Sequence, residues 1–280
     1  MSRWLLRNAS GLAGLAVVVA ASLAGILGPV LLKVDPNLTN LMDRLQPPSF
    51  TGGSSLHLLG TDHLGRDLLS RLLYGARISL MVDLLSTAIS MVLGVGLGLL
   101  TGYRRGVLDD VVMRVGDAQL SIPFLVLAIS VVAVLGPGLT NVILILGVAG
   151  WIQFARIVRA ETLALRLREF VEAARAVGAR DARILVRHVL PNVTASIIVM
   201  SSFQFAQMIV VESSLSFLGL GVRPPTASWG TMINDGRNYI QVAWWLTTIP
   251  GIVIMAVVLG ANSFGDWLRD RLDPHLRNLN

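Results

Sequence analysis

Apolar residues along this chain gather in six long runs separated by polar segments. A helix of about 20 apolar residues crosses a bilayer core about 30 Å thick, and six stretches qualify. The predicted spans are residues 9–32, 78–100, 120–135, 142–158, 195–217 and 242–264. The pattern therefore predicts an all-α membrane protein with six transmembrane helices.

The composition agrees with a membrane location. Apolar residues make up 54% of the chain and charged residues 14%, with a mean hydropathy of +0.68, whereas about 25% of residues are charged in an ordinary globular protein. The absence of cysteine excludes disulfides, thiolate metal sites and a cysteine nucleophile. The net charge of +6 comes from 22 Arg and one Lys against 17 acidic residues. In so apolar a chain this excess indicates arginines on cytoplasmic loops, not nucleic-acid binding.

The positions of the basic residues predict that both termini face the cytoplasm. With the N-terminus inside, 16 of the 23 Arg and Lys residues lie on the cytoplasmic side, eight of them within 156–187. Long polar segments at 33–77 and 218–241 then lie outside, and Gly136-Pro137-Gly138 forms a tight outer turn. We expect an N-terminal anchor helix with an extracytoplasmic segment over 1–77 and a five-helix core over 78–280.

Motifs for nucleotide, metal or catalytic chemistry are not found in the sequence. It contains no G-x-x-x-x-G-K-[ST], and the single lysine, Lys33, follows no glycine-rich loop. His57 and His63 lie near two aspartates in the outer segment, which allows either a metal site or an ordinary solvated loop, and the loop is the simpler interpretation. We therefore expect no bound cofactor and no metal. Glycines at 94, 98 and 102 predict instead the close approach of another membrane helix.

The cytoplasmic segment 156–191 is the most informative part of the sequence. Strong helix formers fill 160–177, with Arg168 and Glu172 one helical turn apart. Gly178 predicts a helix stop, Asp181 an N-cap for a second short helix, and Pro191 the end of that helix. The second helix places Ile184, Leu185, His188 and Val189 on one face.

Two interpretations of this two-faced helix are open. It can lie on the lipid headgroups, or it can dock in a groove of a cytoplasmic partner. Ala173, Ala174 and Gly178 carry almost no side chain, so that a partner's backbone could approach closely, and Glu172 could pair with a partner's cation.

A family resemblance favours the partner. Glu172-Ala173-Ala174, Gly178 and Leu190-Pro191 resemble the EAA loop of bacterial ABC importer permeases. Ten residues after the glycine this chain has His188, where the general pattern has Ile. Segments 59–80 and 212–230 resemble the C-type permease subunit of dipeptide and oligopeptide importers. The matches together cover nearly the whole chain after the first span.

The resemblance implies a type I importer permease that forms half of a translocation channel. Its implied partners are a second homologous permease, two cytoplasmic ABC ATPase domains that hold ATP and Mg, an extracytoplasmic solute-binding protein and the lipid bilayer. It also implies a bacterial cytoplasmic membrane location and no catalytic residue in this chain. The coupling residues it assigns are Glu172, Ala173, Ala174, Gly178, Asp181, Arg183, Ile184, His188, Leu190 and Pro191.

Polar residues within the predicted spans form a second group of candidates. Asp83 lies about one turn into the second span, Glu212 lies near the outer end of the fifth, and the fifth also carries Ser201, Gln204 and Gln207. These side chains can form hydrogen bonds between helices, or they can line a wet path for a peptide backbone. Pro123 and Pro250 mark kinks or ends of spans, and 224–237 can contact a binding protein, form a gate or belong to the aromatic belt.

The sequence therefore predicts a permease subunit of an ATP-driven peptide importer. Permeases of the same family that carry nickel or glutathione look much alike and remain an alternative. A proton-coupled secondary transporter would use Asp83 and Glu212 as proton sites. An intramembrane enzyme would need a nucleophile and a base within the spans, and no His or Cys lies there.

Overall fold

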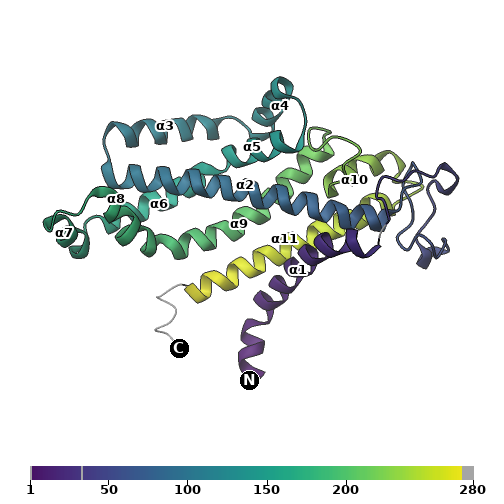
Figure 1. Cartoon of the computed structure of the whole chain (residues 1–280), viewed down its shortest axis with the longest axis horizontal. Coiled ribbons are helices and arrows are strands. Elements are labelled where there is room, and N and C mark those ends of the chain that lie inside the picture. The colour runs from purple at the N-terminus through teal and green to yellow at the C-terminus, as the bar shows by residue number, and fades with distance from the viewer. Residues whose placement is uncertain (1, 33, 273–280) are drawn as a thin grey trace.

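The computed structural model of the chain describes residues 2–32 and 34–272, with side chains from residue 9 onward. Across these ranges the chain is helical and contains no strand beyond one antiparallel bridge, between Thr61 and Asp67. Figure 1 shows the long helices running beside one another in an elongated bundle. The helices are α1 (Ser2–Leu32), α2 (Leu68–Arg104), α3 (Val107–Ser121), α4 (Phe124–Leu135), α5 (Leu139–Ala149), α6 (Trp151–Leu165), α7 (Glu169–Ala176), α8 (Asp181–Ile184), α9 (Leu190–Phe217), α10 (Trp229–Gly236) and α11 (Trp245–Leu272).

Five helical stretches of the described chain are long and apolar enough to cross a membrane. The span predicted at 120–135 is wrong in its bounds, because α3 and α4 form a pair bent by 92°. Pro123 lacks an N–H, and its ring disfavours helical geometry at the residue before it. Ile122 accordingly has φ −94° and ψ 123°, so that α3 ends there and α4 turns sharply away from it. If the bent pair counts as one span, the number is six, as predicted.

The other spans also differ from their predicted bounds, α2 most of all. α2 begins at Leu68, ten residues before the predicted start, because the Asp67 carboxylate caps it by accepting a hydrogen bond from the Ser70 N–H at 2.8 Å. Asp83 therefore lies about four turns into the helix, not one. The predicted boundary at residue 77 falls inside α2. The fourth span consists of α5 and α6, which meet at Gly150.

The predicted glycine seam on α2 is confirmed. A Cβ atom on Gly98 would lie 2.7 Å from the Ala155 carbonyl oxygen, and one on Gly102 would lie 2.7 Å from the Thr162 Cβ. Gly94 faces α6 in the same way, whereas Gly96 has nothing within 4 Å. Apolar side chains gain little by leaving lipid for another helix, so that close backbone packing of this kind holds membrane helices together.

The first and last helices lie along each other in opposite directions. Gly11 and Gly14 near the start of α1 contact Trp267 and Gly260 on α11, whereas Gly25 contacts α2. The beginning of α1 and the end of α11 thus lie near each other, away from the end of the bundle that carries α10 (Figure 1). This agrees with the prediction that both termini face the same side. Lys33 lies outside the described residues.

The opposite end of the bundle carries the outer segment 34–67 and α10. The Arg66 Nε donates to Asp62 Oδ2 at 2.6 Å, and the Nη2 atoms of Arg66 and Arg71 each lie 3.3 Å from Asp235 Oδ2. Arg66, Arg71 and Asp62 are buried. Because buried charges are stable only when paired, this cluster joins the outer segment to α2 and α10.

The two histidines of the outer segment have separate partners. His57 Nδ1 lies 3.0 Å from Asp67 Oδ1, and the His63 ring stacks on Tyr239 with ring centroids 5.4 Å apart. Among the described residues, no group of three or more His, Asp or Glu side chains could hold a metal ion.

Candidate functional site

Helix α7 ends in a Schellman motif centred on Gly178. The Gly178 N–H donates to the Arg175 carbonyl at 3.0 Å, and the Ala179 N–H donates to the Ala174 carbonyl at 3.0 Å. Gly178 has φ +81°, a left-handed conformation that only glycine adopts without strain. The predicted helix stop at Gly178 is therefore confirmed, and it turns the chain sharply into α8.

The second helix of the segment differs from its prediction at both ends. Arg180, not Asp181, is the N-cap, and Asp181 is the first helical residue. Pro191 does not end the helix, because α8 continues through a π-helical turn, Leu185–Val189, directly into α9. In a regular α-helix the Pro191 ring would clash with the carbonyl group of Arg187, and the wider turn ahead of it makes room for the ring.

The segment packs onto the ends of three long helices through its own apolar core. Val171, Ile184 and Val189 are each 0% exposed and pack against Leu99 of α2 and Val158 of α6. The helix predicted over 160–177 is broken at 166–168, which lets α7 fold back and bury Val171. At this break, burial of Val171 against the bundle has overridden helix propensity. We call residues 166–190 the coupling loop.

Buried and exposed faces divide the predicted coupling residues. Six of them are exposed, namely Glu172, Ala173, Gly178, Asp181, Arg183 and Pro191. His188 and Leu190 are partly buried. Ala174 and Ile184 are buried in the protein's own core, so that Ala174 does not offer its small side chain to a partner.

The Tyr103 side chain joins the end of α2 to both helices of the coupling loop. Its hydroxyl donates to Asp181 Oδ1 at 3.3 Å and accepts a hydrogen bond from Arg175 Nη2 at 3.1 Å. The latter bond raises the pKa of Arg175 above its ordinary value. Arg166 Nη1 donates to the Tyr103 carbonyl at 2.8 Å. Sequence reasoning missed Tyr103 because its partners lie more than 60 residues away along the chain.

Large apolar side chains of the coupling loop are exposed. Leu167 is 67% exposed, Val177 is 84% exposed, and Phe170 on α7 is 41% exposed. They are available for contact with another molecule.

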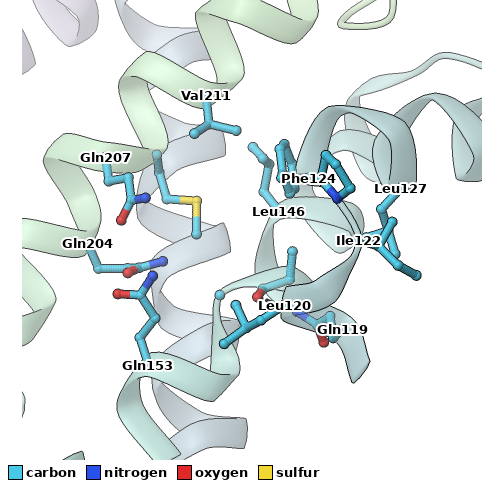
Figure 2. A pocket seen from close by; sticks show the side chains of 14 residues that line it. Gln119, Leu120, Ile122, Phe124, Leu127, Leu146, Gln153, Gln204, Gln207 and Val211 are labelled. Atoms are coloured by element: carbon cyan, nitrogen blue, oxygen red, sulfur yellow. Dashed lines mark hydrogen bonds between the residues drawn. The ribbon is translucent and has the colours of Figure 1, made fainter. Parts of the chain in front are cut away.

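A pocket of about 290 Å³ lies halfway along the bundle, where α3 meets α4 and α5 meets α6. Gln204 and Gln207 of α9 line it, as does Gln119 at the end of α3 and Gln153 at the start of α6. Figure 2 shows Gln153, Gln204 and Gln207 on one side of the pocket and the α3–α4 bend on the other. No charged residue lines it. We call it the amide pocket.

The other polar candidates within the spans lie outside the amide pocket. Glu212 is fully buried and accepts hydrogen bonds from Ser216 at 2.7 Å and Ser79 at 3.4 Å. Asp83 is also fully buried, and neither of its carboxylate oxygens has a partner among the described residues. Ser201 donates to the Ile197 carbonyl within its own helix. Of the five polar candidates, Gln204 and Gln207 therefore line the amide pocket, whereas Asp83, Ser201 and Glu212 do not.

Helix α10 is anchored at the outer end of the bundle. Trp229 is 0% exposed, and its Nε1 donates to the Leu72 carbonyl at 3.1 Å. Its backbone N–H donates to Ser79 Oγ, which in turn donates to Glu212. Trp229 therefore belongs to the core and not to an aromatic belt.

A multi-pass helical bundle with a folded cytoplasmic loop at one end has the architecture of a type I ABC importer permease. The structure superimposes on a chain of the inward-facing MetNI methionine ABC transporter with a TM-score of 0.59 at 19% identity, covering 72% of this chain and 96% of that one. The model of the family "binding-protein-dependent transport system inner membrane component" matches residues 94–278. The chain belongs to this family.

Relatives of similar length agree with this assignment. The di/tripeptide transport system permease protein DppC of Pseudomonas aeruginosa is 42% identical over 97% of this chain and 90% of its own length. The glutathione transport system permease protein GsiD of Pectobacterium atrosepticum is 40% identical over 99% of this chain and 90% of its own length. A second family model, "N-terminal TM domain of oligopeptide transport permease C", matches residues 1–48. The chain is a multi-pass membrane permease and not an enzyme.

Proposed function

We propose that this chain is the permease subunit of an ATP-driven importer for di- and oligopeptides in a bacterial cytoplasmic membrane. Its partners in this proposal are a second homologous permease, two cytoplasmic ATPase domains that bind ATP and Mg, and an extracytoplasmic solute-binding protein. The observation that carries the proposal is the coupling loop, which exposes Glu172 and Ala173 as well as large apolar side chains, while its other face is fixed to α2, α6 and α9.

The coupling loop has two surfaces suited to transmitting movement. Its exposed surface, with Glu172, Ala173, Gly178 and Arg183, would dock on an ATPase domain. Its buried surface, with Ile184 at the centre, would carry the movement of that domain into the bundle. Closure of the two ATPase domains on ATP then opens the channel outward, and hydrolysis resets it.

The path for the cargo in this proposal runs past the amide pocket. Gln204 and Gln207 would line this path, together with Gln119 and Gln153, because all four line the amide pocket. Asp83 and Glu212 are fully buried and Ser201 is partly buried, with its hydroxyl 3.4 Å from Met91 Sδ of α2. We propose these three residues as contacts between helices that shape the path from behind.

Glutathione is a second candidate cargo, since a relative at 40% identity is named for its transport. Glutathione is itself a short peptide and offers the same backbone groups as other peptides. An uncharged path would accept both, and selection between them would then fall to the binding protein.

The coupling role is tested by replacing the exposed residues of the loop. Glu172→Ala removes the carboxylate, and Glu169→Ala on the same helix is the matched control, because Glu169 is also exposed. Gly178→Asn keeps a left-handed turn, which Asn tolerates, and adds a side chain to a position with nothing within 4 Å in this chain. Because Asn in this conformation still carries some strain, a loss in Gly178→Asn reports docking where hydrogen exchange over residues 169–190 stays at the wild-type rate.

We expect Glu172→Ala and Gly178→Asn to abolish ATP-dependent peptide uptake while membrane insertion stays intact. Insertion is measured by extraction from membranes, and uptake with labelled peptide. Uptake at the wild-type rate in both variants would contradict the coupling role.

A further inference from the structure

The amide pocket concentrates one kind of polar group. Four of the six glutamines in the chain line it. The remaining lining residues are apolar, Pro or Gly, with no acidic, basic or histidine side chain among them. A primary amide carries both a hydrogen-bond donor and an acceptor, as a peptide bond does. The pocket therefore offers groups that match a peptide backbone and are indifferent to the charge of a side chain.

The pocket is built where one helical span is interrupted. α3 gives way to α4 at Ile122 and Pro123, with a bend of 92°, and both residues line the pocket. Gly150, between α5 and α6, also lines it, but there the helix continues, since Gly150 has φ −83° and ψ −8° and its N–H donates to the Leu146 carbonyl at 3.1 Å. Interrupted helices within a membrane are tolerated where they line a cavity, and in transporters such breaks mark substrate sites. The α3–α4 bend is thus independent support for a ligand.

Gln204 is the best placed of the four amides. Its side chain lines the pocket although the residue is only 2% exposed, and its Oε1 has no hydrogen-bond partner among the described residues. A Cβ atom on Gly150 would lie 2.6 Å from Gln204 Nε2, so that Gly150 leaves the space in which this amide lies. An unpartnered buried amide lowers the stability of the fold. Because this amide lines a pocket, its free oxygen can accept a hydrogen bond from a ligand there.

The other amides differ in their freedom. Gln119 is fixed, since its Nε2 donates to the Ala149 carbonyl at 2.7 Å and its Oε1 accepts from Trp151 Nε1 at 2.9 Å. Gln153 and Gln207 are exposed to the pocket side and face Gln204 in Figure 2. One fixed amide thus shapes the wall, and three can turn toward a ligand.

We propose that the amide pocket is a transient binding subsite for the backbone of the transported peptide. Gln204 and Gln207 would exchange hydrogen bonds with its peptide N–H and C=O groups, and the uncharged wall would admit side chains of either charge. This inference rests on the proposed peptide-import function and adds to it the group of the cargo that the permease recognises. The pocket volume, about 290 Å³, is close to the lower end of the range of about 300–1,000 Å³ for small-molecule sites.

The test uses the full complex, with its partner permease, ATPase domains and binding protein, in proteoliposomes. The probes are trialanine and trialanine N-methylated at both peptide bonds, which lacks the two backbone N–H donors. The readouts are the maximal uptake rate at saturating binding protein and the ATP hydrolysis rate. We expect the wild type to move trialanine about fivefold faster than the methylated peptide, the equivalent of one ordinary hydrogen bond.

Gln204→Leu and Gln207→Leu should bring that ratio down toward one, while ATP hydrolysis continues. Gln241→Leu is the matched control, because Gln241 is exposed in the outer loop and far along the chain from the pocket. Since Gln204 Oε1 has no partner to lose, Gln204→Leu should fold at least as stably as the wild type. If the Gln204→Leu variant does not assemble into the complex, the uptake ratio of Gln207→Leu decides, because Gln207 is exposed.

A fivefold ratio in both leucine variants, or a ratio of one in the wild type, would overturn the subsite. No ATP-dependent uptake of trialanine by the wild type would instead overturn the proposed function. The two failures are therefore distinguishable.

Discussion

The coupling loop and the amide pocket lie at opposite ends of α6 and differ in almost every physical respect. The loop is contiguous in sequence, over residues 166–190, and carries charged side chains on its exposed face. The pocket is uncharged and assembled from residues of α3, α4, α5, α6 and α9. In the proposed function the loop fits one protein partner and can carry specific charges and shapes, whereas a path for many peptides must avoid them.

The two regions are joined by the α2–α6 seam. α6 begins beside the pocket and ends at the loop, and α2 reaches the loop through Tyr103. A movement of the loop would therefore reach the pocket through a pair of closely packed helices. The predictions below separate the loop, the seam and the pocket.

The largest effect is expected from Ile184→Ala in the core of the loop. Ile184 is 0% exposed, and truncation of such a residue to alanine costs about 2–5 kcal/mol. The loop should come away from the bundle, with uptake reduced more than about tenfold and faster hydrogen exchange over residues 169–190. Ile129→Ala is the control, since Ile129 on α4 is 46% exposed. An equal loss in both variants would mean that the buried face of the loop has no special role.

A smaller loss is expected from tightening the seam. Gly98→Ala places a methyl group against the Ala155 carbonyl and should cost about 1–3 kcal/mol, measured as a lower midpoint of thermal unfolding in detergent. Gly96→Ala, two residues away, meets nothing within 4 Å and should be neutral or stabilising, because alanine is the better helix former. Equal midpoints for the two variants would show that the seam does not hold α2 to α6.

Loss of one hydroxyl should weaken transmission without unfolding the loop. Tyr103→Phe keeps the buried ring and removes the hydroxyl that links Asp181 to Arg175. We expect a few-fold fall in the number of peptides moved per ATP hydrolysed. Tyr74→Phe on the same helix serves as the control, and an unchanged ratio in Tyr103→Phe would remove Tyr103 from the path of transmission.

The smallest effect is a change of preference at the pocket. Gln207→Glu adds a negative charge to a pocket wall that has none. This variant should take up lysine-containing dipeptides about two- to fivefold faster than aspartate-containing ones, as expected for a partly screened charge. Gln207→Arg should shift the preference in the opposite direction. Competition uptake assays measure both, and a shift of the same sign in the two variants would place Gln207 outside the path.

The sequence predicted the loop better than the pocket for a physical reason. Gly178 and the apolar face around Ile184 are local features, and local patterns decide a turn and a buried face. The break at 166–168 and the π-helical turn before Pro191 depend on what the helices pack against, and helix propensity therefore missed both.

The glycine seam was predictable because a four-residue spacing fixes one face of a helix. The bend at Pro123 was less predictable from the sequence, because proline allows either a kinked span or the end of one. The packing of the helices decides between them, and the result is a 92° bend. Gln119 and Gln153 carry no local signal at all. They become neighbours of Gln204 only when the bent α3–α4 pair and the α5–α6 span fold against α9.

The central claim, that this permease works with separate ATPases and a second permease, is tested most directly by identifying what it binds. A tagged chain is purified from its native host in mild detergent, and the proteins that remain bound are identified by mass spectrometry. We predict recovery of a second permease together with one or two P-loop ATPases. Recovery of this chain alone, still active in proteoliposomes under a proton gradient, would contradict the claim and move the mechanism to Asp83 and Glu212.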